Sequence, residues 1–295
     1  MIKKLCFYLK RSLQIFLCIV IILRFTIKDM FHISSVIFYG TPLPLIVLGL
    51  LILLLLVKAS ARKYYAIFTL VLFGLWLKNS YINTTIQDTS EALEVVVWNA
   101  YRTENFEDAF EVNGNLPDVM VLVECDAHDY QKIKEKYKNY YFVLNDDSIG
   151  IFSKTPLRIY YDTIEKIGTR MVHFTTKNIH FYAVDISANV RFFRKPVPNY
   201  IASNIKTEQK TVILGDFNMP YESRFLKNFK KKYQHAFTEK GNGFRETWFW
   251  NIPLLSLDHI WVSKDLEILN VEKIANSKSD HSMLKMYLKN DVEKK

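Results

Sequence analysis

The 295-residue sequence is poor in cysteine, proline and glycine, with three, eight and nine of them. Cys6 and Cys18 lie among the first 20 residues, and Cys125 is alone in the rest of the chain. No intramolecular disulfide can therefore form within residues 91–295, which excludes a disulfide-stapled scaffold. The sequence also contains no internal repeat and no low-complexity tract. Its hydrophobic content of 49% is ample for a sizeable core, so a disordered chain is excluded as well.

Acidic residues are scarce in the first 90 positions. Residues 1–90 contain ten Lys and Arg but only two acids, Asp29 and Asp88, which gives a net charge of +8. Of the 39 basic and 30 acidic residues in the chain, 29 and 28 remain for residues 91–295, a net charge of +1. The overall charge of +9 therefore belongs to the N-terminal third, and it gives no argument for nucleic-acid binding.

Long apolar runs are confined to the same N-terminal third. Residues 31–57 contain no Lys, Arg, Asp or Glu, and they exceed the roughly 20 apolar residues that a membrane span requires. Residues 12–27 are interrupted by Arg24, and residues 64–77 are short enough to be a buried helix of a soluble protein instead. We expect a membrane region over residues 1–78 with about three transmembrane helices.

The distribution of basic residues predicts the orientation of this region. The N-terminus and the loop at residues 58–63 together contain seven Lys and Arg, whereas the other two loops contain three. The N-terminus is then cytoplasmic, and residues 79–295 lie on the extracytoplasmic side. The first run resembles a signal peptide, but no small-residue cleavage pattern follows it, and Cys18 lacks the small residues of a lipid-attachment site. We therefore expect a retained anchor in contact with a lipid bilayer.

A polar linker at residues 79–92 precedes a second domain at residues 93–290. Phe106 and Phe110, and then Tyr130, Ile133 and Tyr137, have helical spacing. The lysines near Tyr137 are the solvated side of such a helix or, alternatively, a basic and aromatic nucleic-acid stripe. Runs rich in Val, Ile, Phe and Tyr predict strands at residues 93–99, 118–124, 140–145, 149–153, 157–162, 171–176, 179–185, 211–216, 258–263 and 282–288. Strands without regular βαβ alternation predict an α/β fold of two packed sheets with helices outside.

Several predicted strands end on a polar residue that can bind a metal or a phosphate. Asn99 ends VVVWN, Glu124 ends VMVLVE, and Asp216 ends TVILGD, with Asn218 two positions later. Asp258 and the pair Asp280 and His281 follow near the C-terminus. Each of these residues alone is more often a turn former or a solvated strand end. Their recurrence at strand ends indicates one shared site.

The order and context of these residues resemble the endonuclease/exonuclease/phosphatase superfamily, which has the DNase I-like fold. Within it, the chain is similar to the bacterial branch that carries three membrane spans before the catalytic domain. The motifs that carry the resemblance are WN at 98–99, PDVMVLVE at 117–124, GIFSKTPL at 150–157, GDFN at 215–218, LDHIWVS at 257–263 and SDH at 279–281. The resemblance implies a two-sheet β-sandwich flanked by helices, and a metal-dependent hydrolase of phosphate esters in the bacterial cytoplasmic membrane.

The residue types suit phosphate-ester hydrolysis, and the resemblance implies the same roles. Glu124, with Asp280 as a second ligand, can hold a hard cation through oxygen atoms, which favours Mg²⁺ or Mn²⁺. His281 can transfer a proton near neutral pH while Asp258 orients its ring. Asp216 can orient or deprotonate the attacking water, and the amides of Asn99 and Asn218 can donate to phosphate oxygens. The sequence leaves open which of Asp216 and His281 is the base.

One position departs from the family pattern. The strand before GDFN usually ends on a phosphate-contacting His or Tyr, whereas Asp185 stands there in this sequence. Asp185 then binds metal, contacts a substrate hydroxyl, or weakens the site. Arg191 and Arg194 follow closely and are either a source of the missing positive charge or ordinary surface residues.

Two further features are less specific. Trp248, Phe249 and Trp250 precede the Asp258 strand and can line a substrate mouth, touch a membrane or pack in the core. Trp248, with Thr247 before it, matches a pair that the membrane-anchored branch often carries. Cys125 is expected to be a buried structural thiol on the opposite strand face from Glu124.

The predicted function is a membrane-anchored phosphoesterase that acts on a phosphodiester or a phosphomonoester, with nucleic acid or a phospholipid or inositol phosphate as substrate. The alternative is a membrane-tethered, non-catalytic binding module that retains the fold. No obligate protein partner is evident from the sequence.

Overall fold

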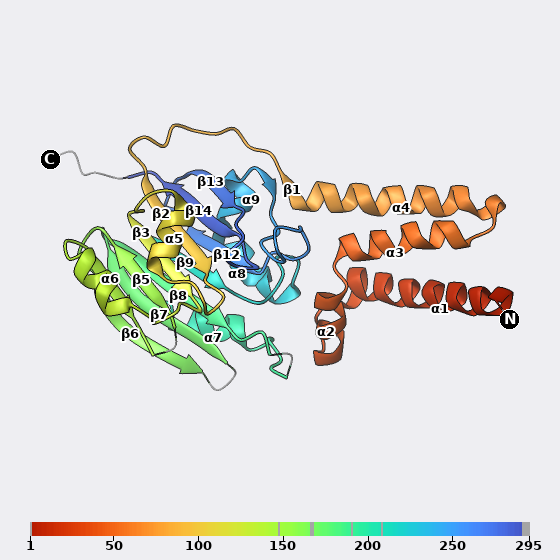
Figure 1. Ribbon diagram of the computed structural model, residues 1–295, viewed down its shortest axis with the longest axis horizontal. Coiled ribbons are helices and arrows are strands. Elements are labelled where there is room, and N and C mark those ends of the chain that lie inside the picture. The colour runs from red at the N-terminus through yellow and green to blue at the C-terminus, as the bar shows by residue number, and fades with distance from the viewer. Residues whose placement is uncertain (1, 147, 166–167, 190, 208, 291–295) are drawn as a thin grey trace. The chain divides into compact units, whose positions relative to one another are not determined.

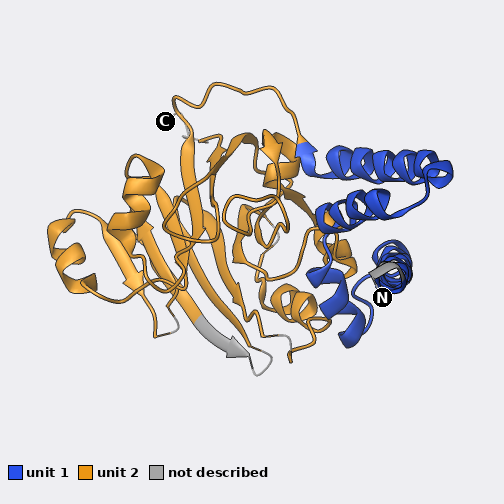
Figure 2. Cartoon of the chain, turned by 45° about the vertical axis from the view of Figure 1, so that its right-hand side comes forward, with its two compact units in different colours: residues 1–81 blue, residues 82–295 orange. Residues whose placement is uncertain are grey.

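The computed structural model describes residues 2–290, except residues 147, 166–167, 190 and 208. The chain divides into two compact units, Met1–Tyr81 and Ile82–Lys295, coloured separately in Figure 2. The division falls within the polar segment at residues 79–92.

The first unit is helical. Its elements are α1 (Ile2–Ile22), the π-helical turn η1 (Leu23–Ile27), α2 (His32–Gly40), α3 (Leu43–Leu56) and α4 (Ala59–Ser80). The uncharged run at residues 31–57 forms two helices, α2 and α3, bent by 66°, instead of the one span that its length suggested. The break falls where Pro42 caps α3 and Pro44 lies in its first turn, because proline cannot continue a preceding helix but suits the start of a new one.

The helices of the first unit share an apolar cluster that includes Leu17, Ile46 and Leu50. Among the described residues, no single helix is both long enough and apolar enough to cross a membrane, although α2 and α3 pass that test as a bent pair. The three-span membrane region stays a prediction.

The second unit contains, within its described residues, two six-stranded sheets (Figure 1). The first sheet has the order β13 (Ile268–Ile274), β14 (Met283–Leu288), β2 (Leu93–Asn99), β3 (Val119–Val123), β5 (Gly150–Ser153) and β4 (Tyr141–Leu144). The second has the order β10 (Tyr233–His235), β12 (Asp258–Ser263), β9 (Thr211–Asp216), β8 (Ile179–Ile186), β7 (Thr169–Thr176) and β6 (Arg158–Glu165). The remaining elements are β1 (Tyr81–Ile82), β11 (Gly243–Phe244), α5 (Phe106–Asn113), α6 (Tyr130–Lys136), α7 (Val197–Asn204), η2 (Arg224–Leu226), α8 (Lys227–Lys232) and α9 (Ala236–Lys240).

The main core lies between the two sheets. Along β2, Val95 and Val97 face this core, whereas Val96 and Trp98 face the cluster formed with α5. Both faces of the strand are thus covered, which explains why the segment is apolar without alternation. The predicted architecture, two packed sheets flanked by helices, is confirmed.

Each of the ten predicted strands corresponds to a strand in the structure, but β10, β13 and the two-residue strands β1 and β11 were not predicted. β13 carries polar residues inside its apolar pattern and pairs with β14 alone among the described strands; Glu272 is exposed at this edge, whereas Asn270 is buried. The helix around Ile133 is present as α6, with Ile133 buried. Lys132 and Lys136 form ion pairs with Asp129 and Glu107, as expected for a solvated helix face.

The two cysteines with described side chains are free, whereas the side chain of Cys6 lies outside the described residues. Cys125 is buried, and this burial raises its pKa to about 12. Such a thiol is structural and unreactive, as the sequence predicted.

Candidate active site

Three neighbouring strands of the second sheet carry an aspartate at the same level. In the strand register, Asp185 of β8 lies opposite Asp216 of β9, which lies opposite Asp258 of β12. The three residues are only 1–3% exposed. Because adjacent strands are about 4.8 Å apart, three carboxylates are stacked in a row. Such a row requires protons or positive charges beside it.

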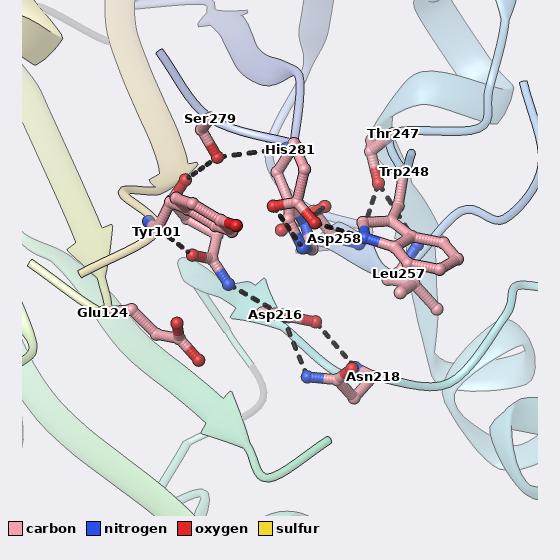
Figure 3. Close-up of polar contacts among 12 residues, drawn as sticks. Tyr101, Glu124, Asp216, Asn218, Thr247, Trp248, Leu257, Asp258, Ser279 and His281 are labelled. Carbon is pink, nitrogen blue, oxygen red and sulfur yellow. Dashed lines mark hydrogen bonds and ion pairs between the residues drawn. The ribbon is translucent and has the colours of Figure 1, made fainter. Parts of the chain in front are cut away.

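His281 lies against this row (Figure 3). Its Nδ1 donates to Asp258 Oδ2 at 2.8 Å, and its Nε2 is 3.8 Å from Asp280 Oδ1. Because an ionised carboxylate only accepts hydrogen bonds, Nδ1 carries a hydrogen and Nε2 is the ring nitrogen that can exchange a proton. The other oxygen of Asp258, Oδ1, is buried and has no hydrogen-bond partner among the described residues.

The electrostatics of the row favour bound protons. Burial, with the neighbouring Asp258 carboxylate, raises the pKa of Asp216 to about 8. Burial by itself disfavours the imidazolium of His281, but the charge of Asp258 and the hydrogen bond to it outweigh burial and raise that pKa to about 10. The two groups influence each other, so the cluster as a whole holds protons near neutral pH.

Two amides hold Asp216 in place. Asn99 Nδ2 and Asn218 Nδ2 each donate to Asp216 Oδ2 at 3.0 Å, and the backbone N–H of Asn218 donates to Oδ1 at 2.8 Å. The Asn218 amide also donates to the carbonyl of Ile186 at 2.7 Å. Both side-chain N–H groups of Asn218 are therefore used within the protein, whereas Nδ2 of Asn99 has one contact among the described residues and a second N–H for a ligand.

Gly215 makes this arrangement possible. Its φ is +144°, and a Cβ atom there would lie 1.8 Å from the carbonyl oxygen of Val184 on the neighbouring strand. Only glycine allows the two backbones to approach so closely. Phe217 points away from Asp216 and Asn218 into the core, where it contacts Phe229 and is fully buried.

The segment at residues 276–281 joins the first sheet to the site. The hydroxyl of Ser279 donates to the carbonyl of Asn99 at 2.8 Å and accepts from the backbone N–H of His281 at 3.0 Å. The indole of Trp248 donates to Asp280 Oδ2 at 2.8 Å. Thr247 Oγ1 accepts from the backbone N–H of Asp258 at 3.2 Å. The segment therefore orients the polar groups of β2 and β12 together.

Glu124 lies at the edge of this group in Figure 3. Its φ of +52° turns the chain as β3 ends, and its carboxylate is 20% exposed. The guanidinium of Arg102 donates to both of its oxygens, at 3.0 and 3.1 Å. Glu124 therefore occupies a position that already attracts a cationic group.

A model of the endonuclease/exonuclease/phosphatase family matches residues 96–281. The chain belongs to this family. The matched region includes the site residues from Asn99 to His281, and the membership supports an activity on phosphate esters.

Several solved structures are similar in fold to this chain. A family protein from Bacteroides thetaiotaomicron has a TM-score of 0.51 at 16% identity, covering 67% of this chain and 97% of that one. The mannosyl-6-phosphatase of the same species has a TM-score of 0.51 at 15% identity, and the match covers 67% of this chain and 99% of that one. A humanized D. rerio TDP2 has a TM-score of 0.51 at 14% identity, and the match covers 68% of this chain and 100% of that one. No curated protein matches significantly.

Asp185, the residue that departs from the family pattern, has a partner on the adjacent strand. Arg170 of β7 pairs with Asp185 in the register and donates to its Oδ2 at 3.0 Å. The side chain of Arg170 is 39% exposed, whereas that of Asp185 is 4% exposed. Burial and the charge of Glu124 nevertheless raise the pKa of Asp185 to about 6.

The positive charge beside Asp185 thus comes from β7 and not from the residues that follow β8. Arg191 is exposed, and its backbone N–H donates to Asn189 Oδ1 at 3.0 Å. Arg194 is buried and donates to the carbonyl of Ser187 at 3.1 Å. Its interpretation as a surface arginine is wrong, because its guanidinium satisfies a loop carbonyl.

Two groups of side chains fit a divalent cation. Ligand atoms of Asp216, Asp258 and His281 lie within 4.8 Å of one another. In that cluster, however, His281 Nδ1 is occupied by its hydrogen bond to Asp258. Glu124 offers two carboxylate oxygens at a partly exposed position, which suits a hard cation that keeps some water. Both groups already have partners, since Arg102 donates to both oxygens of Glu124. Glu124 is the more exposed of the two and suits an oxygen-ligated cation, whereas the buried cluster suits proton transfer.

Sequence reasoning missed Arg102, Arg170 and Ser279. Arg102 lies near Asn99 in the chain, but a lone arginine in a loop carries no signal of its own. Arg170 reaches the row only through the pairing of β7 with β8. Ser279, the first residue of the SDH motif, was the one that could have been found, because serine there precedes two site residues.

Proposed function

We propose that this protein is a divalent-metal-dependent phosphoesterase that hydrolyses a phosphodiester or a phosphomonoester. The observation that carries the proposal is the buried Asp258–His281 pair beside Asp216, in a chain of the endonuclease/exonuclease/phosphatase family. A buried acid with a raised pKa next to an ion-paired histidine is a typical arrangement for proton transfer.

We assign each side chain a distinct task. Asp216 is held by hydrogen bonds at both oxygens and lies at the centre of the site, where it orients the attacking water and, in its ionised form, accepts a proton from it. His281, fixed by Asp258 through Nδ1, presents Nε2 to the phosphate or to the leaving oxygen. Asn99 offers its second N–H to a phosphate oxygen, while Asn218 is a positioning residue for Asp216.

Glu124, with Asp280 as the second candidate, would hold Mg²⁺ or Mn²⁺. When bound, the cation would neutralise negative charge on the phosphoryl oxygens. Arg102 contacts both oxygens of Glu124 and is 75% exposed, so its guanidinium has room to shift toward a substrate phosphate. Arg170, which forms an ion pair with Asp185, provides a second positive charge.

The proposal includes a membrane location. The first unit anchors the chain with its N-terminus in the cytoplasm and the second unit on the extracytoplasmic side, supported by the uncharged run at residues 31–57 and by the placement of Lys and Arg. Fractionation of cells followed by protease treatment of intact spheroplasts tests it. Recovery of the chain in the soluble fraction would contradict the anchor.

A screen of the purified full chain with Mg²⁺ or Mn²⁺ tests the activity over DNA, RNA, phospholipid and inositol-phosphate substrates. We expect hydrolysis of at least one class, complete inhibition by a chelator, and loss of activity in Glu124→Gln. Tyr141→Ala, on the exposed part of β4, is the control. Full activity of Glu124→Gln would show that the cation is held elsewhere.

The alternative, a tethered binding module without turnover, was motivated by Asp185. The ion pair with Arg170 supports a working site, because it restores positive charge where the family pattern has a phosphate-contacting residue. An inactive wild type together with an active Asp185→His variant would favour the binding module.

A further inference from the structure

Exposed aromatic side chains flank the buried site. Tyr101, just after β2, is 46% exposed, and Trp250, before β12, is 39% exposed. Their rings meet edge to face with 5.9 Å between centroids. Phe249 is also exposed and contacts Trp250. The interpretation of Phe249 and Trp250 as core packing is therefore wrong. Large apolar rings that remain exposed next to a buried polar site indicate a surface for a ligand.

Both rings are fixed to the site through their own backbones. The N–H of Tyr101 donates to Asn99 Oδ1 at 3.0 Å, and the N–H of Trp250 donates to the carbonyl of Asp280 at 2.9 Å. In Figure 3 the ring of Tyr101 is directed toward the His281 side of the site. The φ angles of Tyr101 and Trp250 are +56° and +48°. This left-handed conformation is unfavourable for bulky residues, and such strain is found mainly where function requires it.

The residue that follows Tyr101 in the chain is positively charged. Arg102, next to Tyr101, has a φ of +62° and a side chain that is 75% exposed. A guanidinium beside flat aromatic surfaces is the combination by which proteins bind single-stranded nucleic acid, with stacking for the base and charge for the phosphate.

We propose that Tyr101 and Trp250, with Arg102 beside them, form a subsite for an unpaired nucleobase adjacent to the phosphate that is cleaved. This subsite rests on the proposed phosphoesterase function and names its substrate class. The edge-to-face pair forms a corner with two flat walls, so a planar base stacks on one ring while its edge meets the other. A flexible acyl chain gains nothing from that geometry. A contact with one base also agrees with the near-neutral charge of residues 91–295, which does not suit a long duplex footprint.

Two oligomers and two alanine variants of the full chain test the subsite. The oligomers are a short single-stranded oligothymidylate and its abasic counterpart, which carries the same phosphates without bases. For Tyr101→Ala and for Trp250→Ala we expect roughly a tenfold rise in KM for the oligothymidylate, with kcat nearly unchanged. The abasic oligomer should show no change in KM. Tyr101→Phe keeps the ring and should retain the wild-type KM, as should the control Tyr141→Ala, whose side chain is 43% exposed.

A binding assay separates failure of the subsite from failure of the function. Fluorescence anisotropy with labelled oligothymidylate reports on the rings even if the chain hydrolyses nothing. Hydrolysis with equal KM values for all variants would overturn the subsite and leave the phosphoesterase intact. Co-sedimentation with phosphatidylglycerol vesicles tests the other source of contacts. If both alanine variants bound these vesicles more weakly but bound oligothymidylate as the wild type does, the rings would belong to a lipid-binding surface and the proposal would be overturned.

Discussion

Two buried clusters that contain histidine include neighbouring residues of strand β12, and the histidine pKa values in them are shifted in opposite directions. At Asp258, His281 is paired with a carboxylate, and its pKa is raised to about 10. At the next residue, His259 points to the other face of the strand, and burial lowers its pKa to about 4. Burial and the neighbouring His259 also hold the pKa of His235, its partner, well below its usual range. Both environments exclude water, so the neighbouring charges decide the sign.

The second cluster is a chain of neutral hydrogen bonds. His259 Nε2 donates to the carbonyl of Met219 at 2.8 Å, which leaves Nδ1 to accept from His235 Nε2 at 3.0 Å. His235 Nδ1 then accepts from the backbone N–H of Thr238 at 3.3 Å. A proton on either ring would place two donors against each other. This cluster supports the GDFN loop structurally, whereas the first cluster, with its spare carboxylate oxygen on Asp258, is built to handle protons.

The substitution with the largest expected effect removes the histidine of the first cluster. His281→Gln removes the proton-transferring nitrogen, so we expect kcat to fall roughly 10³-fold while the variant stays folded at pH 7. Steady-state kinetics with Mg²⁺ on the substrate found in the screen measures the loss, and circular dichroism verifies the fold. A variant with wild-type kcat would show that His281 is not part of the chemistry.

The next effect is the loss of stability at alkaline pH. The folded pKa of His281 is raised above its ordinary value of 6.5, so its contribution to stability is fully present below pH 6.5 and is lost as pH rises toward 10. The raised pKa of Asp216 acts in the same direction up to about pH 8. We expect the free energy of unfolding to fall by roughly 5 kcal/mol between pH 6.5 and 10. Urea unfolding across this range measures it, and His281→Gln should flatten the dependence.

The smallest effect sharpens the contrast with the second cluster. At pH 7, His259→Gln should lower the free energy of unfolding by about 1–3 kcal/mol, because buried hydrogen-bonding groups lose their partners, while kcat stays within a few fold. The pKa of His259 is lowered, so its stabilisation is present above pH 6.5 and is lost as pH falls toward 4. The cost of His259→Gln should therefore shrink in acid. Urea unfolding at pH 7, 5.5 and 4.5 measures this, and a cost that grew in acid would contradict a neutral His259.

Much of the second unit could be predicted from the sequence, because its signals are local. GDFN, the glutamate strand and SDH each stand where a buried run ends, and strand length and apolarity identified ten strands. The helix break at Pro42 was equally local, yet it was missed because the absence of charge over residues 31–57 dominated the interpretation.

Local sequence patterns thus determined which polar residues adjoin apolar strands and are chemically able to act: Asn99, Glu124, Asp216, Asp258 and His281. Only the tertiary structure decided how they are paired. The register of β7, β8, β9 and β12 places Arg170 against Asp185 and stacks the aspartates in one row. Pairing between strands depends on contacts between segments far apart in the chain, and pKa values depend on the charges that those contacts bring near. This is why two histidines beside the same strand titrate in opposite directions.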